Sequence, residues 1–288
     1  MTHRVLVTGA AGMLGSRVVA DAPDDVEAVP ATRRDADLAV ADEVAALFEK
    51  ASPLHGVIHC AGFTDVDGAE ERPEEARRDN AEATRVVAEA CAARSLPLVA
   101  VSTDYVFDGE SERPYGERAP PRPLNVYGQT KLEAELAALT AWRDGVRIVR
   151  TSWLYGPNGS HFPGRILALA KEKEVLKVVD DQRGSPTSTL ELAPVLWALL
   201  RDAPPGVYHA ACDGDATWYE YARAILEEAG KKGVEVLPCT TAEFPRPARR
   251  PAFSVLDCGK LARTLGKSLA PWRSALQTYI LEEDLGES

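Results

Sequence analysis

Short apolar runs alternate with helix-like patterns through the first half of the chain. The apolar runs predict the strands Val5–Thr8, Val26–Val29, Val57–Cys60, Leu98–Ser102 and Ile148–Ser152. The segments between them repeat apolar residues with the helical period and predict the helices Met13–Asp21, Asp42–Lys50, Pro73–Ala93 and Asn125–Trp142. Strands that alternate with helices at this spacing indicate βαβ units, which build a parallel sheet with helices on both faces.

The pattern loosens after Tyr155. This half predicts the helices Phe162–Glu172, Leu190–Arg201 and Tyr219–Ala229, mixed with the shorter strand-like runs Val175–Val179 and Val207–His209. We therefore predict an α/β fold, in which a doubly wound, Rossmann-type parallel sheet carries a smaller C-terminal lobe. The expected division places the sheet domain at 1–153 and most of the lobe at 154–288, with the chain returning to the sheet around 175–206.

Composition narrows the class of protein. The 288 residues, 45% of them hydrophobic, are enough for one large α/β domain or for a domain with a smaller lobe. The net charge of −11 argues against a nucleic-acid or anionic-membrane surface, because phosphates would be repelled. No apolar run reaches membrane-spanning length, and the N-terminus lacks the profile of a signal peptide. The five cysteines are scattered without the spacing of zinc ligands, so a reduced, cytoplasmic protein is expected.

The stretch VLVTGAAGMLG gives the first indication of chemistry. Gly9, Gly12 and Gly15 follow the first predicted strand and open the first predicted helix, which is the context of a dinucleotide-binding turn. Glycine allows a tight turn and a close approach to a pyrophosphate, and the helix N-terminus offers N–H groups to the phosphates. The spacing Gly-x-x-Gly-x-x-Gly differs from the Gly-x-Gly-x-x-Gly of many dehydrogenases, and a turn that merely requires glycine is the alternative.

The end of the second predicted strand bears on the choice of cofactor. Arg33 and Arg34 stand in VPATRRDADL, where an NAD-specific domain usually has an acidic residue for the ribose 2′-hydroxyl. An arginine there suits a 2′-phosphate through charge-assisted hydrogen bonds, so NADPH is favoured and NADH is the alternative. Asp37 and Leu38 are expected to edge the adenine pocket. In the competing interpretation, Asp35 and Asp37 neutralise a solvated basic pair.

The stretch NVYGQTKLEAE places Tyr127 four residues before Lys131 on a predicted helix. Positions i and i+4 of a helix face the same way, so a phenol and an ammonium can be presented to one small volume. A single Tyr-x-x-x-Lys is weak support for catalysis, because the same spacing also arises from ordinary helix packing.

Seven motifs occur together and in order: the glycine turn, VIHCAGFTDVDGAE, VSTDYVFDG, LNVYGQTKLEAE, VRTSWLYG, VVDDQRGSPT and PARRPAFSVLD. With them the chain, from Arg4 to about Leu256, resembles the dTDP-4-dehydrorhamnose reductase family of extended short-chain dehydrogenase/reductases. The resemblance implies NADPH-dependent reduction of the 4-keto group of a nucleotide-linked 6-deoxyhexose. It also implies that 1–153 is a dinucleotide-binding domain and that the lobe binds the nucleotide-sugar substrate.

The resemblance assigns catalytic roles to three side chains. Tyr127 is expected to donate a proton to the developing alkoxide. Lys131 is expected to lower the pKa of that phenol through its positive charge and to hold the nicotinamide ribose. Thr103, at the end of the fourth predicted strand, is expected to hydrogen-bond the carbonyl oxygen, with a turn-capping hydroxyl as the alternative.

Binding contacts follow from the same resemblance. Cofactor contacts are expected from the residues Gly9, Gly12, Met13, Leu14, Arg33, Asp37, Leu38, Ala61, Gly62, Thr64 and Lys131. Substrate contacts are expected from Asp104, Tyr127, Trp153 and Arg249. Arg249 belongs to a basic cluster with Arg246 and Arg250, for which a substrate diphosphate or an internal ion pair is the expected counter-charge. A turn-forming Asp and a core Trp are the alternatives for Asp104 and Trp153.

The chain departs from the family at several positions. His161 stands before Phe162 where the family commonly has Asn, and Phe63 precedes Thr64 where Tyr or His is common. Some members bind a metal through glutamates at a dimer interface, and Ser16 stands at one of those positions here. We therefore predict no metal and no such dimer, and a homodimer of another kind stays open.

Other functions on the same scaffold remain alternatives. A sugar-nucleotide dehydratase usually has Glu where this chain has Tyr105, and an epimerase would more often have an acid in place of Arg33. A third alternative is a non-catalytic, cofactor-binding regulatory subunit that resembles the methionine adenosyltransferase β subunit. Turnover of NADPH with a 4-keto sugar nucleotide separates these classes.

Overall fold

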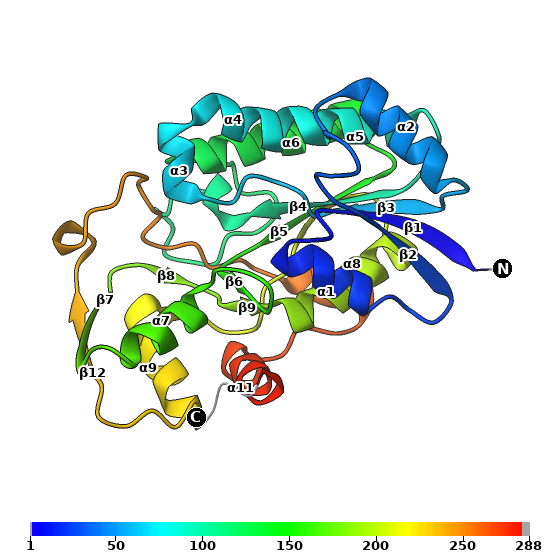
Figure 1. Cartoon of the computed structure of the whole chain (residues 1–288). Coiled ribbons are helices and arrows are strands. Elements are labelled where there is room, and N and C mark those ends of the chain that lie inside the picture. Colours follow the sequence, from blue (N-terminus) through cyan, green and yellow to red (C-terminus); the bar gives the residue numbers. More distant parts are fainter. Residues whose placement is uncertain (1, 284–288) are drawn as a thin grey trace.

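Six parallel strands form the central sheet of the protein (Figure 1). The structure is a computed structural model that describes residues 2–283. From one edge to the other the strands are β10 (Gly206–His209), β5 (Val146–Thr151), β4 (Leu98–Thr103), β3 (Gly56–His59), β1 (His3–Thr8) and β2 (Val26–Ala31). Strand β2 lies on one side of β1, and β3 and the strands after it lie on the other side. This reversal confirms the predicted doubly wound α/β fold. Open sheets of this kind bind ligands at such a switch point, beside the carboxyl ends of the strands.

Alternate side chains of each strand enter different cores, because successive residues of a strand point to opposite faces. In β1, Val5 and Val7 pack into one core and Leu6 packs into the other. Helices cover both faces of the sheet (Figure 1). The first face is covered by α1 (Met13–Ala20) and α8 (Thr189–Asp202). The second face is covered by α2 (Ala41–Ala51), α5 (Ala83–Ala92) and α6 (Val126–Trp142).

The predicted single helix Pro73–Ala93 is interrupted. The structure divides it into α4 (Pro73–Arg77), the π-helical turn η1 (Arg78–Glu82) and α5, preceded by a short helix α3 (Val66–Glu71) that the pattern did not predict. A π turn widens the helix by one residue and often marks a functional position. Here it places Asn80 under the loop that follows β3.

A smaller lobe lies below one end of the sheet in Figure 1. Its own core is built from α7 (Phe162–Ala170), α9 (Trp218–Glu228) and α11 (Trp272–Glu282) with the parallel pair β7 (Val175–Val179) and β12 (Glu235–Cys239). The shorter elements are η2 (Asp104–Val106), β6 (Leu154–Tyr155), β8 (Arg183–Gly184), β9 (Thr187–Ser188), β11 (Ala216–Thr217), η3 (Thr241–Glu243) and α10 (Gly259–Leu265).

The predicted return of the chain to the sheet around 175–206 needs correction at both ends. Residues of β7 pair with β12 and stay in the lobe. The segment that returns is α8, which packs on the sheet, followed by β10, which pairs with β5. No helix between residues 2 and 283 combines the length and the apolar content that crossing a membrane requires.

Candidate active site

The glycine turn between β1 and α1 has no space for side chains. Gly9 has φ +68°, and a Cβ there would lie 2.6 Å from the backbone nitrogen of Ala61. A Cβ at Gly15 would lie 2.1 Å from the carbonyl oxygen of Gly9. Gly12 precedes α1 and supplies no side-chain cap, so the first N–H groups of the helix are open to another acceptor. A close backbone approach and open N–H groups fit a dinucleotide pyrophosphate.

Met13 and Leu14 open helix α1 beside this turn. Leu14 is buried in the core of the sheet, whereas Met13 is half-buried and contacts the Gly159 region. Leu14 therefore fixes the helix on the sheet, and Met13 is the one with surface to offer a ligand.

The loop after β3 connects the glycine turn to helix α6. Ala61 contacts Gly9, and a Cβ on Gly62 would come within 3.8 Å of Nζ of Lys131. Small residues here let the glycine turn and the lysine approach each other. Thr64, farther along the loop, is exposed.

Asn80 holds this loop in place and was missed by the sequence analysis. Its Oδ1 accepts a hydrogen bond from the N–H of Phe63 at 2.9 Å, and its Nδ2 donates to the carbonyl of Phe63 at 3.2 Å. The same Nδ2 donates to Oγ1 of Thr130 on α6 at 3.0 Å. Asn80 thus ties η1, the loop after β3 and α6 together. The only signal in the sequence is a polar residue inside an otherwise helical pattern.

Tyr127 and Thr103 meet at the carboxyl end of β4. The hydroxyl of Thr103 hydrogen-bonds that of Tyr127 and lowers its pKa, but burial has the larger effect and raises the pKa of the phenol to about 12. The ring of Tyr127 packs edge-on against Tyr105, with centroids 5.8 Å apart. Thr103 also accepts the backbone N–H of Tyr105 at 3.2 Å, so its capping role and its contact with Tyr127 coexist.

Lys131 lies one turn farther along α6 and is buried. Its Nζ donates to the carbonyl of Val101 at 2.7 Å. Burial lowers the pKa of Lys131 to about 8, while the carboxylate of Glu135 acts in the opposite direction. Glu135 itself forms a buried ion pair with Arg150, with Oε2 and Nη2 2.6 Å apart. The pKa of Tyr127 is raised on balance, because desolvation outweighs the lowering contact with Thr103. The effect of Lys131 on the phenol stays a prediction.

Asp104 is buried beside this pair. Burial raises the pKa of its carboxyl to about 7, and the hydroxyls of Ser254 and Thr103 lower it in part. Its Oδ1 accepts from Thr103 at 3.1 Å, whereas Oδ2 has no hydrogen-bond partner within the described part of the chain. A buried acceptor of this kind usually has a partner, so Oδ2 is suited to a ligand hydroxyl.

Trp153 marks the passage from the sheet to the lobe. It has φ +46°, a left-handed conformation that is unusual for a bulky residue. Its ring stacks on Trp218 with centroids 3.5 Å apart and planes 4° apart, and a Cβ on Gly184 would lie 2.5 Å from the ring. The strained backbone is thus held by packing on both sides of the junction.

The basic cluster near the C-terminal end has an internal partner. Arg246 and Arg250 both bind Asp67 of α3, whose pKa they lower to about 2 against the opposing effect of burial. Arg249 is exposed, and its carbonyl accepts Nδ2 of Asn125, the residue that caps α6. Of the two counter-charges considered for this cluster, the internal ion pair is therefore present for Arg246 and Arg250.

The residues predicted for the adenosine end lie together. Arg33 is 82% exposed and binds Asp79 of η1 at 3.0 Å, while Asp37 binds Arg78 of η1. Leu38 is half-buried against the core of the second face. Within residues 2–283, no three His, Cys, Asp or Glu side chains are grouped so as to hold a metal ion.

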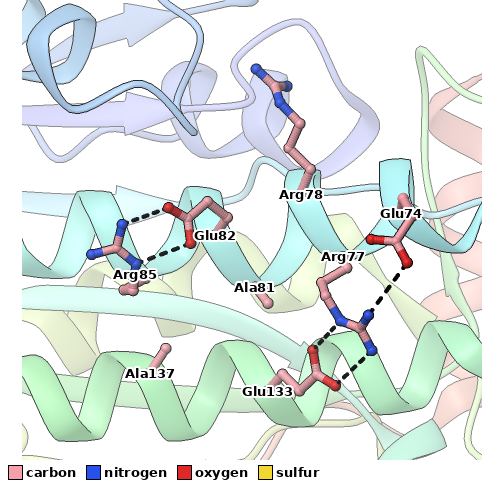
Figure 2. Close-up of a pocket in the computed structure, with 8 residues that line it drawn as sticks. All are labelled: Glu74, Arg77, Arg78, Ala81, Glu82, Arg85, Glu133 and Ala137. Carbon is pink, nitrogen blue, oxygen red and sulfur yellow. Dashed lines mark hydrogen bonds and ion pairs between the residues drawn. The ribbon is translucent and has the colours of Figure 1, made fainter.

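A hollow of about 430 Å³ lies elsewhere, on the outer side of the α4, η1 and α6 helices (Figure 2). Most of its charged side chains bind one another: Arg77 bridges Glu133 and Glu74, and Arg85 binds Glu82. Arg78 points away and binds Asp37 instead. Glu133 is on the outer side of α6, whereas Lys131 is buried beneath it. This hollow is therefore separate from the Tyr127 site.

Comparison with known proteins adds to this geometry. The family described as RmlD substrate binding domain matches residues 3–284. A dTDP-4-keto-6-deoxy-D-glucose reductase of Streptomyces niveus is 41% identical, with 89% of each chain covered. A dTDP-4-dehydrorhamnose reductase of Sinorhizobium fredii is 36% identical, with 96% of each chain covered. The crystal structure of a dTDP-4-dehydrorhamnose reductase of Bacillus anthracis in complex with NADP is 35% identical, with a TM-score of 0.94 over 98% of this chain and 100% of that chain.

These matches extend over nearly the whole chain and include both the sheet and the lobe. They agree with the order of the motifs from the glycine turn to the late arginine-rich segment. The chain therefore belongs to the RmlD substrate-binding-domain family.

Proposed function

We propose that this protein reduces the 4-keto group of a nucleotide-linked 6-deoxyhexose, of the dTDP-4-dehydrorhamnose type, with NADPH as the reductant. The observation that carries the proposal is the contact of half-buried Tyr127 with buried Thr103, with Lys131 one helical turn away beside the loop that touches the glycine turn. The relatives named as reductases support the substrate class, and the relative bound to NADP supports the cofactor.

The cofactor would be held at the switch point of the sheet. The backbone of Gly9 and Gly12 and the N-terminus of α1 would bind the pyrophosphate. Ala61 and Gly62 would let the nicotinamide half lie close to the loop after β3, within reach of Lys131. With NADPH bound there, the nicotinamide would supply the hydride that the ketone carbon receives.

Tyr127 and Thr103 act on the ketone oxygen. Two hydroxyls at one point can hydrogen-bond the carbonyl and stabilise the charge that develops on it. An alkoxide is a stronger base than a phenolate, so the proton moves from the hydroxyl of Tyr127 to the new alkoxide. Lys131, charged below its pKa of about 8, supplies the positive charge that favours the phenolate left behind.

The lobe would hold the nucleotide sugar against this site. The free Oδ2 of Asp104 would accept a sugar hydroxyl, and Trp153, fixed by its stack on Trp218, would border the hexose. Arg249, which is exposed near the start of α6, would contact the diphosphate. With five free thiols among its described residues, the protein is proposed to work in the reducing cytoplasm.

The structure also bears on the dehydratase alternative. Elimination requires a base, and Tyr105 stands where dehydratases usually have Glu. Burial raises the pKa of Tyr105 above its ordinary value, so this phenol keeps its proton near neutral pH. Tyr105 therefore does not replace the missing carboxylate.

The test is a turnover screen. NADPH oxidation should be followed by absorbance with dTDP-, UDP-, GDP- and CDP-4-keto-6-deoxyhexoses, and the product configuration read by NMR. We expect turnover with the dTDP sugar and a reduced 4-hydroxyl in the product. A protein that binds NADPH but oxidises it with none of these sugars would instead be a cofactor-binding regulatory subunit.

A further inference from the structure

Two arginine–carboxylate pairs cross between the loop after β2 and the π turn η1. Arg33 of the loop binds Asp79 of the turn at 3.0 Å, and Arg78 of the turn binds Asp37 of the loop. Arg78 also lies 3.4 Å from the second oxygen of Asp79. We call these four residues the crossed pairs.

The crossed pairs lie at the adenosine end of the proposed cofactor site. The loop starts where β2 ends, and the carbonyl of Ala31 at that end accepts the N–H of Ala10 in the glycine turn at 3.1 Å. In folds of this class, the residues just after the second strand contact the adenosine ribose. The π turn is the element that faces this loop from across the sheet edge, through contacts that span more than forty positions of the chain.

The carboxylate of Asp79 lies between the guanidinium groups of Arg33 and Arg78. One of its oxygens binds Arg33 and the other lies against Arg78. Its side chain is only 19% exposed, whereas those of Arg33 and Arg78 are 82% and 47% exposed. The carboxylate is therefore fixed by its surroundings, and the arginines have room to turn toward another anion.

A phosphate is a better partner for both arginines than a single carboxylate. It carries more charge and three strong acceptor oxygens, and each guanidinium presents five N–H donors in a planar fork. The crossed pairs contain two cations and two anions and so have no net charge to attract a phosphate. Binding one therefore requires that the arginines give up part of their contact with Asp79.

We infer that Arg78 is a second cation for the 2′-phosphate of NADPH, and that Asp79 competes with this phosphate for Arg33 and Arg78. This inference rests on the proposed function, because it takes NADPH as the cofactor. The turn η1 then helps to determine cofactor specificity. The preference for NADPH over NADH is smaller than it would be if Arg33 and Arg78 were not also bound to Asp79.

Binding measurements without sugar substrate test the inference. The dissociation constants of NADPH and NADH should be measured by fluorescence titration, and those of adenosine 2′,5′-bisphosphate and AMP by calorimetry. Arg78→Gln should weaken NADPH about tenfold and leave NADH nearly unchanged, because only the former carries the phosphate. Asp79→Asn should tighten NADPH about fivefold, again with little effect on NADH. The adenosine bisphosphate should follow NADPH, and AMP should follow NADH.

Arg77→Gln is the matched control. It removes the same charge from the adjacent residue, but Arg77 points to the opposite side of the helix and binds Glu133 (Figure 2). It should leave the ratio of the two dissociation constants unchanged. Arg78→Lys, which keeps the charge without the planar fork, should give a ratio between those of the wild type and Arg78→Gln.

An unchanged ratio in Arg78→Gln, with normal NADPH binding by the wild type, would overturn the role of Arg78 and leave the proposed function intact. Unchanged NADPH binding in Asp79→Asn would overturn the competition by Asp79. A wild-type protein that does not bind NADPH would overturn both this inference and the proposed function.

Discussion

Tyr127→Phe removes one proton donor and almost nothing else. The ring of Tyr127 is half-buried and packs edge-on against Tyr105, and phenylalanine can keep that contact. The hydroxyl of Tyr127 contacts Thr103. The Oγ1 of Thr103 also accepts a hydrogen bond from the N–H of Tyr105 and donates one to the carboxyl of Asp104. Loss of the phenol oxygen therefore leaves Thr103 with other partners, and the fold should be preserved.

The expected size of the effect follows from the acidity of the groups. Without the phenol, the proton must come from water, whose pKa is about 15.7. The pKa of Tyr127 is about 12. If the proton is half transferred in the transition state, the difference of roughly 3.7 units lowers the rate about 10²-fold. An unpositioned water is a poorer donor still, so we expect a loss of ~10²–10³, which lies within the usual range for a positioned acid.

The assay is single-turnover reduction of the 4-keto sugar by bound NADPH, with cofactor binding measured separately by fluorescence. Tyr105→Phe is the matched control, because it removes the phenol oxygen of a neighbouring half-buried tyrosine whose contact is with Arg250. The control should reduce the ketone at close to the wild-type rate. The reasoning is refuted if Tyr127→Phe binds NADPH normally and also keeps the wild-type rate of the chemical step.

Four further predictions follow from the same geometry. The rate of reduction should fall as pH rises through about 8, because Lys131 loses its charge there. A rate that stays flat from about pH 7 to about pH 9.5 would contradict this role of Lys131. Glu135→Gln should lower the free energy of unfolding by about 3–5 kcal/mol, measured by denaturant titration, because Arg150 is left as a buried charge without its partner. Gly9→Ala should abolish cofactor binding in a titration, since φ is +68° and the added methyl meets the backbone of the loop after β3. Arg33→Ala should weaken NADPH about tenfold more than NADH, and equal weakening of both would show that Arg33 does not read the phosphate.

The sheet could be predicted because its inner strands, such as β3 and β4, are buried on both faces. Such strands read as continuous apolar runs, and the predicted runs lie within one or two residues of β1 through β5 and β10. The pattern failed where burial is partial. Strand β12 includes Pro238 and has mostly half-exposed side chains, so it carries no alternation and was not predicted.

The contacts that shape the site are less accessible to sequence reasoning. The π turn of η1 adds one residue to a single turn, and a segment as short as Arg78–Glu82 is too short to reveal a changed period in the sequence. Asp67 binds Arg246 across 179 positions, and Trp153 stacks on Trp218 of helix α9. Such pairings depend on tertiary packing, and neither partner has a local pattern that points to the other. The positions of Tyr127 and Lys131 on one face of α6 were accessible because helical spacing alone places them there.

The protonation states in the site match those from which ketone reduction starts. A phenol with a pKa of about 12 is almost fully protonated near neutral pH, and Lys131, with a pKa of about 8, is mostly charged. Oxidation of an alcohol would start from the phenolate of Tyr127, the form that its raised pKa disfavours. Reduction requires it to start as an acid, which is the form the structure stabilises. The raised pKa of Tyr127 therefore suits a proton donor, since the proton stays on the phenol until a stronger base, the new alkoxide, forms beside it.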